Sequence, residues 1–358
     1  SADNIQFDIK KIIKRSRDVS KKLTNGVNYL LKKNKVDLIK GHGKIISPNN
    51  LLVFQNDSSI NLSAENIIIA TGARSRDLDK IKSDGVNVWN YKNAMIPEKL
   101  PSSILVIGSG AIGVEFATFY NAFNVDVTIV ELQNRILPVE DEEISDFAEK
   151  IFKKSGIDII CNSNVESINI QKTCISADII SKDKQIIKEF EKVILAVGIQ
   201  GNVEDIGLEN FNNIKINKNH IEVDEYYRTG QSGIYAIGDV VGPPWLAHKA
   251  MHEAIICVEK IANLKNVNPL NLLGIPGCTY SIPQIASIGL TESEAKNQGF
   301  DIKVGKFPFK ANGKAIALGD EEGFVKTIFD SLTGELIGAH MIGTDVTELI
   351  QGYSIAKN

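Results

Sequence analysis

The spacing of apolar residues along this chain predicts short buried strands that alternate with helices, the pattern of an α/β protein. The clearest stretch runs from Ile104 to Glu131. Its apolar run at 104–107 predicts a buried strand, residues 111–123 have helical spacing, and residues 126–130 predict a second strand. A strand, a helix and a strand in this order predict a βαβ unit with parallel strands.

Before this unit, residues 8–33 have the spacing of a basic amphipathic helix. The candidates for its apolar stripe are Ile12, Ile13, Leu23, Val27, Leu30 and Leu31. Its lysines and arginines predict a solvated face and not a nucleic-acid surface. The elements expected next are a strand at 36–39, a turn at Gly41-His42-Gly43, a hairpin at 51–54 and 59–62, and a buried strand at 67–70.

Two polar, irregular stretches, 74–101 and 199–230, predict crossings between domains. Between them, after the βαβ unit, we expect a helix at 141–155 and a small meander laid against the parallel sheet, with strands at 157–161, 165–171, 175–180 and 185–196. Beyond the second crossing, the pattern predicts a strand at 233–239, helices at 247–262 and 291–298, strands at 284–289, 302–308, 324–329 and 335–342, and a last helix from Asp345.

Three glycines, Gly108, Gly110 and Gly113, form a G-x-G-x-x-G turn inside the βαβ unit. The first allows the tight turn, the second lets the backbone approach a pyrophosphate, and the third lets the helix pack closely on the strand. Free N–H groups at the helix N-terminus favour the pyrophosphate charge. Glu131 follows about 20 residues later, where a carboxylate accepts hydrogen bonds from ribose hydroxyls and repels a 2′-phosphate. The sequence therefore predicts a dinucleotide site that prefers NAD to NADP.

Composition narrows the classes of partner. Of the 358 residues, 43% are hydrophobic and 23% charged, as in ordinary globular proteins. The net charge of −4 argues against nucleic acid as the main partner. No apolar run reaches the roughly 18 residues that a membrane span needs. We therefore expect neither a nucleic-acid nor a membrane partner.

Cysteine and histidine spacing gives no sign of a metal site. His248 and His252 are four residues apart, but no third candidate ligand lies near them in the sequence. The four cysteines, Cys161, Cys174, Cys257 and Cys278, are far apart and lack C-x-x-C spacing. Cys161 and Cys257 lie in apolar segments, which favours buried, reduced thiols.

Three more apolar strand patterns end in small-residue turns: Thr71-Gly72, Val197-Gly198 and Gly238-Asp239. With the G-x-G-x-x-G unit between the first and the second, this order resembles the flavoprotein pyridine nucleotide-disulfide oxidoreductases. Within that family the chain is similar to the dihydrolipoyl dehydrogenases. The runs that carry the resemblance are GSGAIGVE at 108–115, RILP at 135–138, GDVVGPPWLAHK at 238–249 and GCTYSIPQIASIGLTE at 277–292.

The resemblance implies an α/β fold with two Rossmann-like dinucleotide-binding domains, the NAD domain being inserted in the FAD domain, and an α+β interface domain for dimerisation. The first and last parts are expected to be truncated. We expect a partial FAD-binding domain at 1–76, the NAD-binding domain at 77–221, a second FAD segment at 222–265 and a partial interface domain at 266–358.

The resemblance also assigns residues to FAD and NAD. The FAD contacts that it implies are Gly43, Thr71, Gly72, Ala73, Asp239, Trp245, Leu246, Ala247 and His248. For NAD they are Gly108, Ser109, Gly110, Ala111, Ile112, Gly113, Val114, Glu115, Glu131, Val165 and Gly198. Asp239 would hydrogen-bond the ribityl chain, and Glu115 would support the chemistry by pairing with a lysine beside the redox cysteines. Trp245 departs from the Met that the resemblance leads us to expect.

Other departures concern whole segments of the family pattern. The family begins with its own FAD-binding βαβ unit and a C-x-x-x-x-C redox pair, and it ends with a His-Pro and Glu acid–base pair. Here the one full G-x-G-x-x-G is at 108, no two cysteines are five apart, and the chain stops at Asn358. We therefore expect an interior fragment that holds no catalytic residue and is inactive by itself.

The function that the resemblance implies is that of dihydrolipoyl dehydrogenase in a 2-oxo acid dehydrogenase complex. Such an enzyme works as a homodimer and oxidises dihydrolipoamide, carried on a lipoyl domain, through a redox disulfide and FAD to reduce NAD⁺. Another NAD-linked flavoprotein reductase, such as a soluble transhydrogenase, and a non-catalytic NAD-binding module are the alternatives. We expect a bacterial cytoplasmic protein, or one of the mitochondrial matrix if the source is eukaryotic.

Overall fold

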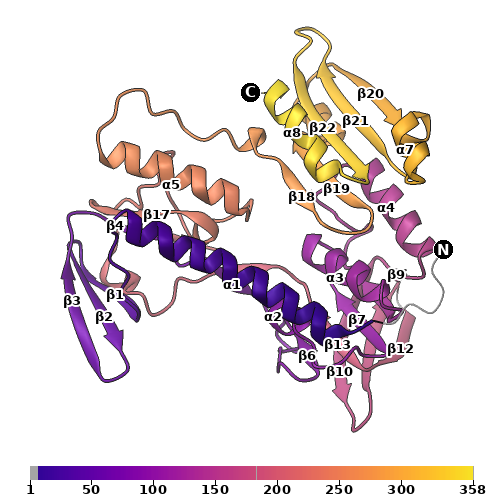
Figure 1. The fold of residues 1–358 in the computed structure, drawn as a ribbon, viewed down its shortest axis with the longest axis horizontal. Coiled ribbons are helices and arrows are strands. Elements are labelled where there is room, and N and C mark those ends of the chain that lie inside the picture. Colours follow the sequence, from indigo (N-terminus) through magenta and orange to yellow (C-terminus); the bar gives the residue numbers. More distant parts are fainter. Residues whose placement is uncertain (1–6, 183, 358) are drawn as a thin grey trace. The chain divides into compact units, whose positions relative to one another are not determined.

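The computed structural model describes residues 7–182 and 184–357, and Figure 1 shows their fold. The chain divides into two units. The first comprises Ser1–Ile13, Ser75–Gly198 and Leu272–Asn358, and the second comprises Lys14–Arg74 and Ile199–Asn271. Strands alternate with helices over residues 103–160 in the first unit, and both units contain helices and strands, so the α/β class predicted from the apolar spacing is confirmed.

A five-stranded parallel sheet forms the centre of the first unit. Its order is β6 (Val88–Trp89), β13 (Lys192–Leu195), β7 (Ser103–Ile107), β8 (Asp126–Val130) and β9 (Asp158–Ile160). Helix α3 (Ala111–Asn121) joins β7 to β8, and α4 (Glu142–Lys154) joins β8 to β9. The predicted βαβ unit is confirmed, except that α3 ends two residues earlier than expected.

Both faces of β7 are buried, which explains its continuous apolar run. Ile104 and Val106 pack in one core with Val114 of α3, whereas Leu105 and Ile107 belong to a second core on the opposite face. That second core is shared with the antiparallel meander β10 (Ser163–Ile170), β11 (Ile175–Ser181) and β12 (Lys184–Phe190). A meander packed on the parallel sheet is therefore confirmed, but it has three strands. The stretch 157–161, expected as its first strand, instead forms β9 of the parallel sheet.

A second strand prediction in this region was also wrong. The pattern favoured a single strand at 185–196, but the chain breaks at Glu191. β12 pairs antiparallel with β11, while β13 pairs parallel with β7. Residues 193–195 of β13 are almost fully buried, whereas β12 alternates, so the two halves belong to different sheets. The stretch 74–101 is also not wholly irregular, since it contains the end of β5 (Ala73–Ser75), β6 and α2 (Tyr91–Ala94).

The last part of the first unit is an antiparallel sheet, yellow and orange in Figure 1. Its order is β18 (Gly277–Thr279), β19 (Gln284–Gly289), β22 (Leu336–Gly343), β21 (Phe324–Asp330) and β20 (Ile302–Pro308), with helices α6 (Glu292–Asn297), α7 (Gly313–Leu318) and α8 (Val346–Lys357). All eight residues of β22 are buried, as expected for the central strand. The four predicted strands and both predicted helices are confirmed, whereas β18 and α7 were not predicted.

The second unit has its own core. Strands β1 (His42–Ser47), β2 (Asn50–Gln55) and β3 (Ser58–Ser63) form an antiparallel sheet, and β4 (Ile67–Ile69) pairs in parallel with β17 (Ile234–Ala236), which precedes α5 (Ala247–Ile261). The stretch 199–230 holds short strands, so its prediction as wholly irregular was wrong: β14 (Ile199–Gly201), which pairs with β5, and β15 (Ile216–Asn217) with β16 (His220–Ile221).

Two predictions near the start of this unit were wrong. Residues 36–40 form no strand, and Val36 and Leu38 are exposed, so apolar character there does not reflect burial in a sheet. His42 and Gly43 lie in β1 and not in a turn. Helix α1 (Ile9–Lys33), in contrast, confirms the predicted helix, although none of its residues is buried.

Candidate functional site

The turn between β7 and α3 requires glycine at two positions. Gly108 has φ of 97°, and a Cβ there would lie 2.5 Å from the carbonyl oxygen of Ala196. A Cβ on Gly113 would lie 2.1 Å from the carbonyl oxygen of Gly108. These separations are far below a van der Waals contact, so the close helix–strand approach that the glycine pattern predicted is present.

Gly110 is different because its surroundings are open. It is the N-cap of α3, with no side-chain cap, and a Cβ there would meet no atom within 4 Å. The N–H groups of the first turn of an α-helix have no partner within the helix. Backbone donors, the positive end of the helix dipole and free space together suit a pyrophosphate group. The local geometry therefore fits the phosphates of a dinucleotide.

Glu131 lies directly after β8 and beside this turn. Its Oε2 accepts hydrogen bonds from the Ser109 N–H at 2.9 Å and the Ser109 hydroxyl at 2.5 Å, and its Oε1 accepts one from the Gln133 N–H at 2.8 Å. A carboxylate offers about four acceptor positions, so three donors leave about one for a ribose hydroxyl. Glu131 is 7% exposed and is held in one orientation. The carboxylate and the glycine turn are thus brought together as the spacing predicted.

The other residues expected at the NAD site lie in different surroundings. Ala111 and Ile112 are exposed on the first turn of α3, whereas Val114 is buried in the core. Gly198 is exposed and has φ of 100°. Val165 is 4% exposed and packs in the core between the parallel sheet and the meander. Of this group, Ala111, Ile112 and Gly198 have surface available for a ligand.

Glu115 lies on α3, and its Oε1 accepts a hydrogen bond from the backbone N–H of Tyr280 at 2.8 Å. Burial raises the pKa of this carboxyl group above its usual value, and the bond from Tyr280 partly offsets the increase. The contact joins α3 to the segment after β18, within the first unit. Tyr280 was not anticipated from the sequence, because no local pattern reports a contact across 165 residues.

The residues expected at the FAD site lie in the second unit. Asp239 belongs to a 3₁₀ turn, η2 (Gly238–Val241), directly after β17. Among residues 7–182 and 184–357, none donates a hydrogen bond to its half-buried carboxylate. A free carboxylate in partly dry surroundings is a strong acceptor for hydroxyl groups. This donor–acceptor chemistry fits the ribityl chain of FAD.

The remaining FAD candidates lie near strand ends and the start of α5. Thr71 donates from Oγ1 to the Asn202 carbonyl at 2.7 Å, and Gly72 has φ of 70° with open space around it. Those not yet described are Gly43 on β1, Ala73 at the start of β5, Trp245 and Leu246 before α5, and Ala247 and His248 on its first turn. Trp245 lies with its ring 5.8 Å from that of His220, a packing contact.

The cysteine thiols show no sign of an activated, reactive group. All four are free thiols, but only Cys257 is buried; Cys161, Cys174 and Cys278 are half-buried, so the burial expected for Cys161 was wrong. Burial raises the pKa of Cys161 and of Cys257 to about 11, and also raises that of Cys278. Because the thiolate is the reactive form, these groups are protonated and unreactive at neutral pH.

The sequence matches two family models that together cover almost the whole chain. Residues 3–254 match the model described as pyridine nucleotide-disulphide oxidoreductase, and residues 275–358 match the dimerisation domain of the same family. The chain belongs to the pyridine nucleotide-disulphide oxidoreductase family. The family resemblance seen in the motifs is thereby confirmed, and so is the expected fold class of nucleotide-binding and dimerisation domains.

Individual relatives agree with this assignment. The dihydrolipoyl dehydrogenase of Zymomonas mobilis is 49% identical over 353 residues, which cover 98% of this chain and 76% of that protein. The enzyme of the same name from Rhizobium etli is 47% identical over 371 residues, 99% of this chain and 77% of that protein. The expected enzyme class, an FAD- and NAD-dependent oxidoreductase, is confirmed.

Solved structures show the same fold. LpdA from Mycobacterium tuberculosis has a TM-score of 0.92 at 25% identity, with 99% of this chain and 78% of that chain covered. The HOCl-induced flavoprotein disulfide reductase RclA from Escherichia coli has a TM-score of 0.87 at 26% identity, over 98% of this chain and 80% of that chain. In the part of this chain that the structure describes, no helix has the length and apolar character needed to cross a bilayer.

Proposed function

We propose that this chain serves a dihydrolipoyl dehydrogenase of a 2-oxo acid dehydrogenase complex. The observation that carries the proposal is the arrangement of Gly110 and Glu131, which offers free N–H groups to a pyrophosphate and a carboxylate to a ribose. FAD, when bound, would supply a two-electron carrier between a redox disulfide and NAD⁺. The two dihydrolipoyl dehydrogenases at 47–49% identity support this reading over a soluble transhydrogenase or a non-catalytic module.

In this proposal the first unit binds NAD and the second unit binds FAD. The first turn of α3 binds the NAD pyrophosphate, and Glu131 orients the ribose and disfavours a 2′-phosphate. Asp239 and the start of α5 bind FAD. The substrate is dihydrolipoamide carried on a lipoyl domain, and the antiparallel sheet, which matches the dimerisation domain, forms a homodimer. We place the protein in a bacterial cytoplasm, or in the mitochondrial matrix of a eukaryote. The proposed segments are 1–76 and 222–265 for FAD, 77–221 for NAD and 266–358 for the interface domain.

The cysteines of this chain are not proposed as the redox pair. They are Cys161, Cys174, Cys257 and Cys278, and no two are five apart in the sequence. The raised pKa values of three of them disfavour thiolates. We therefore expect this polypeptide, by itself, to bind nucleotide but not to oxidise dihydrolipoamide.

The test combines a calorimetric titration of the purified chain with NADH and NADPH and a visible spectrum recorded before and after FAD and then NADH are added. We expect NADH binding that is much tighter than NADPH binding. A flavin band that NADH bleaches would support the FAD role. Dihydrolipoamide-dependent reduction of NAD⁺ by the chain alone would contradict the conclusion that its own cysteines are not the redox pair. A chain that binds no NADH would contradict the proposed function.

A further inference from the structure

A buried ion pair on α5 lies behind the turn that carries Asp239. Lys249 and Glu253 are one helical turn apart, and Nζ of the lysine lies 2.8 Å from Oε1 of the glutamate. Each residue is 2% exposed. Burial of two full charges costs several kcal/mol per ion unless further hydrogen bonds compensate each of them. Both charges have such further partners.

Both further partners are backbone groups at the two ends of the same turn. Oε2 of Glu253 accepts the N–H of Gly238 at 2.6 Å, and Nζ of Lys249 donates to the carbonyl oxygen of Gly242 at 2.9 Å. Gly238 opens η2, and Gly242 directly follows it. The ion pair thus holds the turn at its first residue and just beyond its last.

The turn needs such support because its backbone is unusual. Gly238 has φ of 76° and Gly242 has φ of 107°, so both ends adopt conformations that glycine reaches easily and equally easily leaves. Between them, Val240 is fully buried, while Asp239 has its carboxylate free of protein donors among the described residues. A stable core could be built with apolar residues in place of the ion pair. What apolar residues could not do is bond to the two backbone groups that set the position of Asp239.

We propose that Lys249 and Glu253 are positioning residues for FAD, which hold the Gly238–Gly242 turn so that Asp239 meets the ribityl hydroxyls. This inference rests on the proposed FAD role of Asp239. Neither side chain is expected to touch the cofactor, since both are covered by the turn and the helix. The sequence holds one signal for the pair, a lysine and a glutamate at i and i+4 of a predicted helix.

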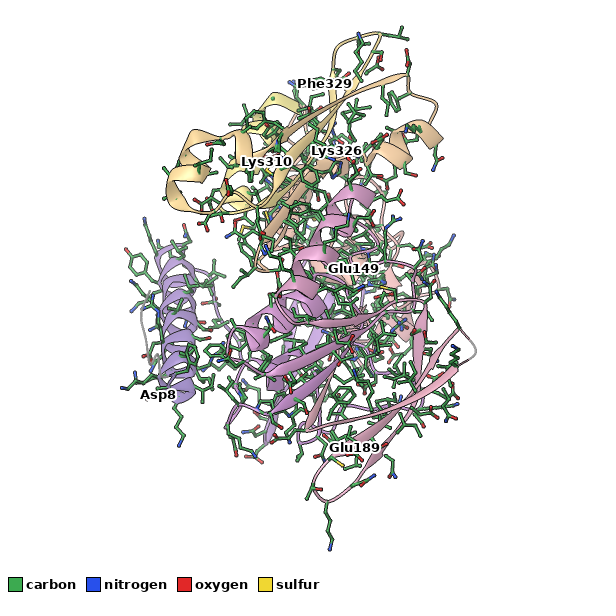
Figure 2. All side chains as sticks on the ribbon, turned by 90° about the vertical axis from the view of Figure 1, so that its right-hand side faces the viewer. Asp8, Glu149, Glu189, Lys310, Lys326 and Phe329 are labelled. Atoms are coloured by element: carbon green, nitrogen blue, oxygen red, sulfur yellow. The ribbon has the colours of Figure 1, made fainter. Side chains whose placement is uncertain are left out.

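The experiment compares three variants of the full chain. Asp239→Ala removes the proposed ligand; the double variant Lys249→Met/Glu253→Leu removes both charges together, so that neither remains buried and unpaired. The matched control, Glu149→Leu/Lys153→Met, removes an i, i+4 pair on α4 in which Lys153 is exposed and Glu149 is half-buried, and Nζ and Oε1 are 2.6 Å apart. Glu149 is labelled in Figure 2. FAD affinity is measured by flavin fluorescence, NADH affinity by calorimetry, and backbone protection of residues 238–242 by hydrogen exchange.

We expect the double variant on α5 to weaken FAD binding about tenfold or more, the loss that corresponds to about one net charge-assisted hydrogen bond. Exchange at residues 238–242 should become faster by a similar factor, whereas NADH affinity should stay within about twofold of the parent. The control variant should change none of these quantities.

Two results would overturn the inference in distinguishable ways. If Asp239→Ala weakens FAD binding but the double variant on α5 does not, or if exchange at residues 238–242 is unchanged, the positioning role is wrong and the proposed FAD site stands. If Asp239→Ala leaves FAD binding unchanged, the FAD role of Asp239 is wrong and the positioning role falls with it.

Discussion

The ammonium group of Lys326 lies 2.8 Å and 3.0 Å from the two carboxylate oxygens of Asp141, although 185 residues separate the two in the chain. Lys326 is on β21, and Asp141 is the N-cap of α4. Two more carboxylates approach the same nitrogen, Glu292 at 2.6 Å and Glu143 at 3.2 Å. Lys326, labelled in Figure 2, is 1% exposed. This buried cluster joins α4, next to the parallel sheet of the first unit, to the antiparallel sheet of the same unit.

Replacement of Lys326 by Met should destabilise the first unit by about 3–5 kcal/mol, because it leaves carboxylates partly buried without their cation. Urea unfolding at pH 7 measures this loss. Lys310→Met is the control, since Lys310 is exposed and labelled in Figure 2, and it should change stability by less than about 0.5 kcal/mol. Equal stability of the two variants would show that the cluster does not hold the two parts together.

The same cluster predicts how the stability lost in Lys326→Met depends on pH. Hydrogen bonds from Lys296 and then Lys326 lower the pKa of Glu292 to about 2, and Lys306 with Lys326 lowers that of Glu143. Acids with a lowered folded pKa add stability above their unfolded pKa, which is lost as the pH falls towards the folded value. The difference between parent and Lys326→Met should therefore shrink between pH 5 and pH 2.

The pKa of Glu140 is shifted in the opposite direction, upward. Burial raises its pKa to about 7, and its Oε2 has no hydrogen-bond partner among the described residues, although a bond with Ser287 partly offsets the increase. Between the unfolded value of 4.5 and about pH 7 the folded chain holds a proton that the unfolded chain has lost, so this group reduces stability as the pH rises. Glu140→Gln should raise the free energy of unfolding by about 1–3 kcal/mol at pH 8 and by much less at pH 5. A gain that is equal at both pH values would contradict this account.

Gly110→Ala and Gly113→Ala should separate binding from folding. A methyl group on Gly110 enters open space, and its φ of −66° suits any residue, so the variant should fold normally. NADH binding should nevertheless weaken about tenfold or more, because the methyl group occupies the approach to the α3 N–H groups. A methyl group on Gly113 would lie 2.1 Å from a carbonyl oxygen and should cost about 1–3 kcal/mol of stability or more. Thermal unfolding and NADH titration of both variants test the pair.

Glu131→Gln should weaken NADH binding by about tenfold or more and reduce the preference for NADH over NADPH. The neutral amide accepts a weaker hydrogen bond from a ribose hydroxyl and no longer repels a 2′-phosphate. Glu189→Gln, at an exposed position of β12 labelled in Figure 2, is the matched control for loss of one negative charge. An unchanged ratio of the two affinities in Glu131→Gln would refute the specificity role of this carboxylate.

The local geometry of the candidate nucleotide site could be predicted from the sequence. Gly108, Gly110, Gly113 and Glu131 lie within 24 residues, and each role follows from backbone sterics or from spacing along one βαβ unit. The antiparallel strands 284–289 and 302–308 were also predicted to the residue, since their apolar and polar patterns are bounded by clear turns. In these two cases the local sequence pattern was sufficient to predict where the element lies.

Tertiary structure decided what depends on residues far apart in the chain. The split of 185–196 into β12 and β13 depends on which sheet each half joins, and the exposure of 36–39 depends on the absence of a neighbouring strand within the described fold. The Asp141–Lys326 pair and the Glu115–Tyr280 bond join segments more than 150 residues apart, which no local pattern reports. The Lys249–Glu253 pair was visible as a spacing, but its bonds to Gly238 and Gly242 arise only because the chain returns from the turn into α5. Hydrophobic spacing determines which face of an element is buried; which charges meet there is determined by packing of the whole unit.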